Sequence, residues 1–145
     1  MSDTVRDTIV VSADPDAIMD VIADFDAYPE WQDEVREVEI LETDDDGWGT
    51  RVRFVVSAQG FAATYVLGYR YGDTEMRWSL VEGDKVRLND GAYVLSDRGD
   101  GTTLVTYELA IEPAITLPGL VRRQIARRIA DTALTGMKRR VESGA

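Results

Sequence analysis

The pattern of apolar and polar positions divides the chain into extended segments and helical segments. Residues 4–13 carry β-branched side chains at a density typical of a strand. Six further extended segments cover residues 35–43, 49–58, 63–71, 75–83, 87–97 and 102–112. Short turn sequences rich in glycine and aspartate separate them, including Gln59–Gly60. Because parallel pairing would need long crossovers, these segments predict an antiparallel meander.

A helix is predicted between the first two strands. Asp14 is suited to cap it, and Pro15 is suited to its first position, where a missing N–H costs nothing. Its apolar face repeats every three or four residues, opposite three aspartates: Ala17, Ile18, Val21, Ile22 and Phe25 against Asp16, Asp20 and Asp24. A second, proline-broken helical turn is expected at residues 28–31.

The chain is expected to close with a long helix that starts after a Leu-Pro-Gly sequence and runs to about Glu142. An apolar row recurs along it at intervals of four: Val121, Ile125, Ile129, Ala133, Met137 and Val141, joined by Leu134. A curved sheet and an amphipathic helix each need to bury one side, so we expect the helix to lie across the concave face of the sheet. The length of 145 residues suits one α+β domain, residues 1–145.

Several short sequences carry a family resemblance. They are Asp24-Phe25, Tyr-Pro-Glu-Trp at 28–31, Gly-Thr-x-Val-Arg-Phe at 49–54, Asp-Gly-Ala-Tyr-Val-Leu at 90–95, Asp-Gly-Thr-Thr-x-Val-Thr-Tyr at 100–107 and Leu-Pro-Gly at 117–119. In this order the chain resembles the bacterial polyketide cyclase/dehydrase branch of the START and Bet v 1 (SRPBCC) superfamily. The resemblance implies a helix-grip fold, a curved antiparallel sheet wrapped around a long C-terminal helix. It rests on framework positions, with no catalytic signature.

Alternation along each strand separates an inner face from an outer face. In residues 51–56, Phe54 shares the inner face with two valines, while Arg51 and Arg53 point outward. Extending this parity to the other strands, and adding the inward side of the last helix, gives the predicted ligand-binding set: Phe54, Tyr65, Leu67, Trp78, Leu80, Asn89, Tyr93, Tyr107, Leu109, Ile125, Ile129 and Met137.

Tyrosine is unusually frequent on this inner face. A buried tyrosine needs a partner for its hydroxyl, so several on one concave face favour an apolar space with a few polar groups, as in a small-molecule site. The competing interpretation is ordinary core packing, with the hydroxyls reaching water at the rim. Trp31 carries the same two interpretations, as a side chain at the mouth of a pocket or as a wedge between helix and sheet.

Two functions remain open for such a pocket. One is a binding module for a lipid, isoprenoid or polyketide-like molecule. The other, which the resemblance implies, is an aromatase or cyclase that bends a reactive poly-β-ketone. The available polar groups are Tyr65, Tyr93, Tyr107 and Asn89, and a tyrosine with its usual pKa of about 10 is a poor base at neutral pH. The sequence therefore favours binding, and no catalytic residue is assigned.

Composition narrows the remaining chemistry. Without cysteine or histidine, the chain has no disulfide, no thiolate or imidazole metal ligand and no Ser-His-Asp triad. The aspartates at 44–46 fit a hairpin turn better than a calcium loop, and Glu82 and Asp84 fit a solvated strand end better than an acid–base pair. No nucleotide motif is present, so no cofactor is expected.

Charge is unevenly distributed. The net charge of −11 argues against a nucleic-acid partner, although residues 120–145 hold seven basic residues against two acidic ones. That basic helix could face an acidic membrane surface or a protein partner, but a solvated polar face is the simpler reading. The polar N-terminus and the short apolar runs predict a cytoplasmic protein without membrane insertion.

Overall fold

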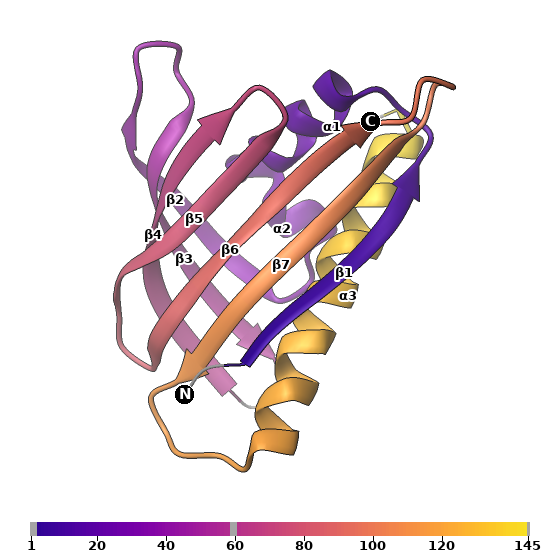
Figure 1. Ribbon diagram of the computed structural model, residues 1–145. Coiled ribbons are helices and arrows are strands. Elements are labelled where there is room, and N and C mark those ends of the chain that lie inside the picture. The colour runs from indigo at the N-terminus through magenta and orange to yellow at the C-terminus, as the bar shows by residue number, and fades with distance from the viewer. Residues whose placement is uncertain (1–2, 59–60, 145) are drawn as a thin grey trace.

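In a computed structural model, which describes residues 3–58 and 61–144, seven strands form one antiparallel sheet (Figure 1). The strands are β1 (Asp3–Val11), β2 (Val35–Thr43), β3 (Gly49–Ala58), β4 (Phe61–Gly72), β5 (Glu75–Gly83), β6 (Val86–Asp97) and β7 (Thr103–Pro113). Their order is β1-β7-β6-β5-β4-β3-β2, so consecutive strands from β2 to β7 are neighbours and β1 pairs with β7. This confirms the predicted meander. The turn expected at Gln59–Gly60 lies outside the described residues.

The helices are α1 (Pro15–Ile22), the 3-10 turn η1 (Phe25–Ala27), α2 (Tyr28–Trp31) and α3 (Gly119–Glu142). Asp14 caps α1 as predicted, because its carboxylate accepts a hydrogen bond from the Ala17 N–H at 2.9 Å. All the helices lie on one face of the sheet (Figure 1). The fold is therefore the helix-grip arrangement that the family resemblance implied.

The buried side of α3 agrees with the predicted apolar row only in its C-terminal half, where Ala133, Leu134 and Met137 are buried as predicted. The buried residues are Ala126, Ala130, Ala133, Leu134, Gly136 and Met137, whereas Val121 is 37% exposed and Ile125 is half-buried. An α-helix turns about 100° per residue, so positions four apart drift by about 40° at each step. A row from Val121 to Val141 thus rotates by about 200° and cannot stay against the sheet. The other buried positions are taken by small residues, Ala126, Ala130 and Gly136, which let the helix approach closely.

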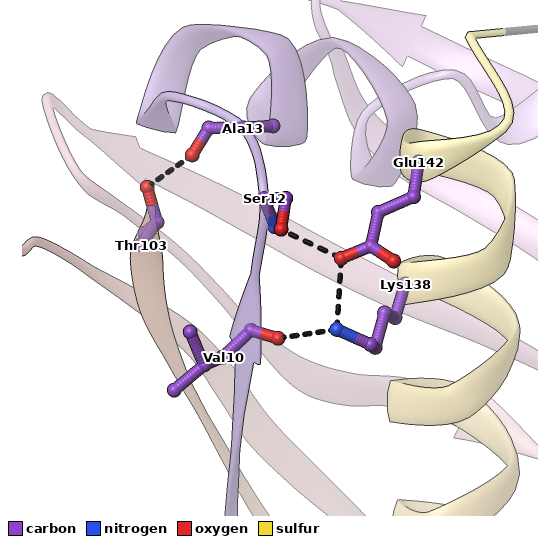
Figure 2. Close-up of polar contacts among 6 residues, drawn as sticks. All are labelled: Val10, Ser12, Ala13, Thr103, Lys138 and Glu142. Atoms are coloured by element: carbon purple, nitrogen blue, oxygen red, sulfur yellow. Dashed lines mark hydrogen bonds and ion pairs between the residues drawn. The ribbon is translucent and has the colours of Figure 1, made fainter. Parts of the chain in front are cut away.

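The C-terminal half of α3 is tied to the rest of the protein by polar contacts (Figure 2). The Lys138 ammonium donates to the Val10 carbonyl at 2.6 Å and to the Glu142 carboxylate at 2.8 Å. The same carboxylate accepts from the Ser12 N–H at 2.9 Å. These contacts, which we call the Lys138–Glu142 clasp, join the last turns of α3 to the end of β1.

Gly136 brings α3 against α2. A Cβ atom at this position would lie 2.8 Å from the Trp31 carbonyl oxygen and 3.2 Å from the indole ring. Trp31 is only 9% exposed, and it lies against α3 rather than in the cavity described below. The structure thus places Trp31 as a packing wedge between helix and sheet, the second of its two predicted interpretations.

Candidate ligand-binding cavity

A cavity of about 70 Å³ lies between the concave face of the sheet and the helices. The residues that line it come from α2 and its C-terminal cap, from six of the strands and from α3: Tyr28, Gln32, Val35, Phe54, Leu67, Tyr69, Met76, Trp78, Asn89, Tyr93, Tyr107, Leu109, Ile111 and Ile129. None of these lining residues carries a formal charge. The cavity is therefore an uncharged space with an aromatic wall.

Trp78 is the centre of that wall. Its ring lies 6.0 Å from Tyr69, 5.8 Å from Tyr93 and 5.6 Å from Tyr107, measured between ring centroids. Tyr93 and Tyr107 sit opposite each other on β6 and β7 and meet edge to face at 4.9 Å. Tilted and edge contacts of this kind favour aromatic pairs beyond simple burial. They hold the wall in one arrangement.

The Trp78 ring has room because its cross-strand neighbour is Gly91. A Cβ atom on Gly91 would lie 2.4 Å from the Trp78 ring and 2.5 Å from the Glu108 carbonyl oxygen. Both distances are far below van der Waals contact, so only glycine leaves space for the indole beside β6. The glycine in the Asp-Gly-Ala-Tyr-Val-Leu sequence thus positions the centre of the wall.

Some polar groups of the cavity have a hydrogen-bond partner in the protein and others do not. The Tyr28 hydroxyl donates to the Ile22 carbonyl, and the Trp78 indole N–H donates to Asn89 Oδ1 at 3.0 Å. In the described part of the chain, the hydroxyls of Tyr69, Tyr93 and Tyr107 make no hydrogen bond with a protein group. Those three groups are available to a molecule in the cavity.

Burial keeps these tyrosines neutral. Desolvation is the main cause that raises the pKa of Tyr93 and Tyr107 well above the ordinary value of 10, with a smaller contribution from neighbouring tyrosines. Tyr28 and Tyr69 shift in the same direction for the same main reason. At neutral pH these side chains can donate or accept a hydrogen bond but cannot act as a base.

Eight of the twelve predicted site residues line the cavity: Phe54, Leu67, Trp78, Asn89, Tyr93, Tyr107, Leu109 and Ile129. The other four lie elsewhere. Met137 is fully buried in the core, Tyr65 and Leu80 are partly buried against its edge, and Ile125 is half-buried on α3. Whether any of the twelve contacts a ligand remains a prediction.

Sequence reasoning missed six lining residues: Tyr28, Gln32, Val35, Tyr69, Met76 and Ile111. Tyr69, Met76 and Ile111 lie two residues from the predicted Leu67, Trp78 and Leu109 on the same strands, so strand alternation places them on the same inner face. Tyr28 and Gln32 lie in the irregular connection after α1, where no periodicity tells which side chains turn inward. Only the folded arrangement reveals them.

The acidic candidates act as turn residues. The Asp44 carboxylate accepts hydrogen bonds from the backbone N–H groups of Asp46 and Trp48, each at 2.9 Å, and Gly47 has a left-handed φ of 88°. The Asp84 carboxylate accepts from the Thr64 N–H at 3.0 Å. Across residues 3–58 and 61–144, acidic side chains form no cluster able to hold a metal ion.

The fold matches the helix-grip fold of START and Bet v 1 proteins. Residues 11–138 match the family model described as "Polyketide cyclase / dehydrase and lipid transport". The chain therefore belongs to the polyketide cyclase/dehydrase and lipid transport family. No curated protein matches it in sequence.

Solved structures share the fold over the whole chain. A START superfamily protein from Mycobacterium smegmatis is 24% identical, with a TM-score of 0.90 over 98% of this chain and 99% of that one. The Zhui aromatase/cyclase from Streptomyces sp. R1128 is 18% identical, with a TM-score of 0.83 over 98% and 94%. The di-domain aromatase/cyclase StfQ of the steffimycin biosynthetic pathway is 14% identical, with a TM-score of 0.72 over 95% of this chain and 44% of that one.

Among the described residues, no helix has both the length and the apolar character needed to cross a bilayer. The longest helix, α3, carries several arginines on its outward side.

Proposed function

We propose that this protein binds a small hydrophobic molecule, such as a lipid, an isoprenoid or a polyketide-like compound, in the cavity between the sheet and α3. The observation that carries the proposal is the uncharged aromatic wall with three tyrosine hydroxyls that have no protein partner. Ligand sites typically combine an apolar lining with a few polar groups of this kind. The family description, which includes lipid transport, agrees with this chemistry.

The size of the cavity sets a condition on binding. A space of about 70 Å³ has room for a few water molecules, whereas pockets for organic ligands usually span about 300–1,000 Å³. A ligand must therefore displace part of the lining. The first turns of α3, which precede the lining residue Ile129, pack loosely, because Leu120 is 62% exposed and no residue from 119 to 125 is fully buried.

The experiment that tests binding is native mass spectrometry of gently purified protein, followed by solvent extraction of any bound molecule. We expect a co-purifying hydrophobic compound, whose mass reveals the ligand class. A bound ligand should also raise the melting temperature by mass action. A clean apo mass, together with no thermal shift across a panel of lipids, isoprenoids and aromatic polyketides, would contradict the proposal.

Catalysis in the same cavity is the second candidate. The structural similarity to the Zhui aromatase/cyclase favours it, and a neutral tyrosine can donate a hydrogen bond to a ketone oxygen. The cavity holds no carboxylate, ammonium or guanidinium to move a proton, which favours binding over turnover. Incubation with a poly-β-ketone substrate separates the two, since an enzyme accelerates loss of the substrate and a carrier only protects it.

The domain organisation, the cellular location and the partners of the protein are also proposals. We propose a single domain over residues 1–145 that works in the cytoplasm, without a nucleic-acid partner because the net charge is −11. A weakly bound protein partner would contact the basic residues of α3. Gel filtration and cell fractionation test these points.

A further inference from the structure

Asn89 is held in one orientation by Trp78. The indole nitrogen of tryptophan is only a donor, so the atom that faces it at 3.0 Å must be the amide oxygen of Asn89. The two N–H groups of Asn89 Nδ2 then point away from the indole. In the described part of the chain, they make no hydrogen bond with a protein group.

The side chain that carries these donors is largely enclosed, although Nδ2 itself still borders space that a water molecule can reach. Asn89 is 6% exposed and lines the cavity. A buried donor without a partner is costly, and native proteins rarely keep one unless water or a ligand satisfies it. The unpaired amide therefore indicates a place where a bound molecule presents an acceptor atom.

The neighbouring groups narrow the chemistry of that acceptor. Asn89 and Tyr93 lie on the same face of β6, with Gly91 between them, and Tyr107 is the cross-strand partner of Tyr93. Trp78 contacts all three side chains. No positively charged side chain lines the cavity, so a carboxylate or phosphate would lose its hydration without gaining a counter-charge.

We propose that Asn89 is a specificity-determining residue that selects neutral ligands with a carbonyl or similar oxygen, bound by its amide N–H groups beside Trp78. This inference rests on the proposed function, because it names the ligand class of the same cavity. It distinguishes an oxygen-bearing neutral ligand from a plain hydrocarbon and from a fatty acid anion.

Three probes of nearly equal shape test the proposal: 2-acetylnaphthalene, 2-isopropenylnaphthalene and 2-naphthoate. They differ in whether the side group is a ketone, a hydrocarbon or a carboxylate. In equilibrium dialysis at neutral pH, we expect the ketone to bind about five- to tenfold more tightly than the hydrocarbon. The carboxylate should bind at least about tenfold more weakly than the ketone, because its charge is unpaired in the cavity.

The outcomes separate the two proposals. If no probe binds, the hydrophobic-ligand function fails and the specificity of Asn89 fails with it. If the ketone and the hydrocarbon bind equally, or if the carboxylate binds most tightly, the cavity binds ligands but the role of Asn89 is overturned.

Two variants test whether Asn89 causes the preference for the ketone over the hydrocarbon. Asn89→Asp keeps an oxygen that accepts from Trp78 but loses both N–H donors, and Asn89→Leu removes all the polar atoms at similar volume. In both variants, the ratio of the hydrocarbon and ketone Kd values should fall to about one. The ratio cancels any general loss of folded protein, and the wild-type ratio already tests the proposal should a variant fail to fold. A ketone preference that persists in both variants contradicts it.

Discussion

The two faces of the sheet alternate residue by residue along the same strands, yet they are built on different chemistry. On the inner face, Phe54 and Trp78 pack among other rings. On the outer face, their neighbours Arg53 and Arg77 form exposed ion pairs with Glu39 at 3.1 Å and Glu75 at 2.9 Å. Close packing of rings stabilises the inner face, whereas the outer face carries charged side chains in contact with water. We therefore expect them to respond differently to substitution, pH and salt.

The largest difference should come from removing an aromatic ring. Tyr107→Ala or Tyr93→Ala deletes a side chain that is at most 5% exposed, and comparable deletions cost about 3–5 kcal/mol. Either change should also weaken ligand binding. The matched outer-face variants Arg51→Ala and Arg53→Ala should change the free energy of unfolding by about 0.5 kcal/mol or less. Urea denaturation measures the free energy of unfolding of all four variants. Equal losses for the tyrosine and arginine variants would show that the assignment of side chains to the inner and outer faces is wrong.

Two glycines give a finer comparison. Gly91→Ala should cost about 2–3 kcal/mol, because its Cβ would collide with the Trp78 ring and with a backbone oxygen. Gly68→Ala places its Cβ 3.3 Å from the end of the Val81 side chain, which can move, so we expect a change below about 1 kcal/mol. Melting temperatures of the two variants provide the measurement. A neutral Gly91→Ala would mean that Trp78 does not need to lie across β6.

Of the two faces of the sheet, the inner one should respond more strongly to alkaline pH. Burial raises the pKa of Tyr28, Tyr69, Tyr93 and Tyr107 above 10 in the folded protein. Above pH 10 the unfolded chain releases phenolic protons that the folded protein keeps, so the free energy of unfolding falls as pH rises. Each such tyrosine adds a slope of about 1.4 kcal/mol per pH unit. The outer-face arginines stay charged throughout this range.

Urea unfolding between pH 9 and pH 11 tests this slope. Tyr107→Phe keeps the ring and removes one titrating hydroxyl, so its slope should be smaller than that of the wild type. Stability that does not change up to pH 11 would contradict the burial of these hydroxyls.

The smallest effect should come from the outer-face ion pairs. Arg53 and Glu39 have side chains 36% and 59% exposed, and pairs of this kind contribute about 0.2–1 kcal/mol. A double-mutant cycle with Arg53→Ala and Glu39→Ala should give a coupling in this range that shrinks at high salt. A coupling above about 2 kcal/mol would show that the outer face is more than a solvated surface.

The sequence was sufficient for the elements and for the faces of the strands. Alternation with a period of two separates Phe54 from Arg53, because one face of the strand is buried and the other is exposed to water. Buried positions carry apolar residues and exposed positions carry polar ones, so the sequence records the difference. The path of α3 was harder to predict. Alanine and glycine carry little hydrophobic signal, so the larger Val121 and Ile125 misled the assignment of the buried side.

The size of the cavity and the hydrogen bonds around it could not be predicted from the sequence, for a different reason. Its volume depends on how the Tyr28, Trp78 and Ile129 side chains fill the space between sheet and helix, and on hydrogen bonds between segments far apart in sequence. The bond from Tyr28 to the Ile22 carbonyl and the bond that orients Asn89 are both of this kind. No local pattern records them.

The Lys138–Glu142 clasp makes the two ends of α3 open at different rates. It fixes the last turns of α3 to β1 (Figure 2), while the first turns carry exposed Leu120 and Val121. Local opening draws on the least stable segments, so backbone amides near residue 122 should exchange with deuterium much faster than those near residue 137. If an occupant leaves past the first turns, its residence time is set by how often they open, and strengthening the clasp would leave that rate unchanged.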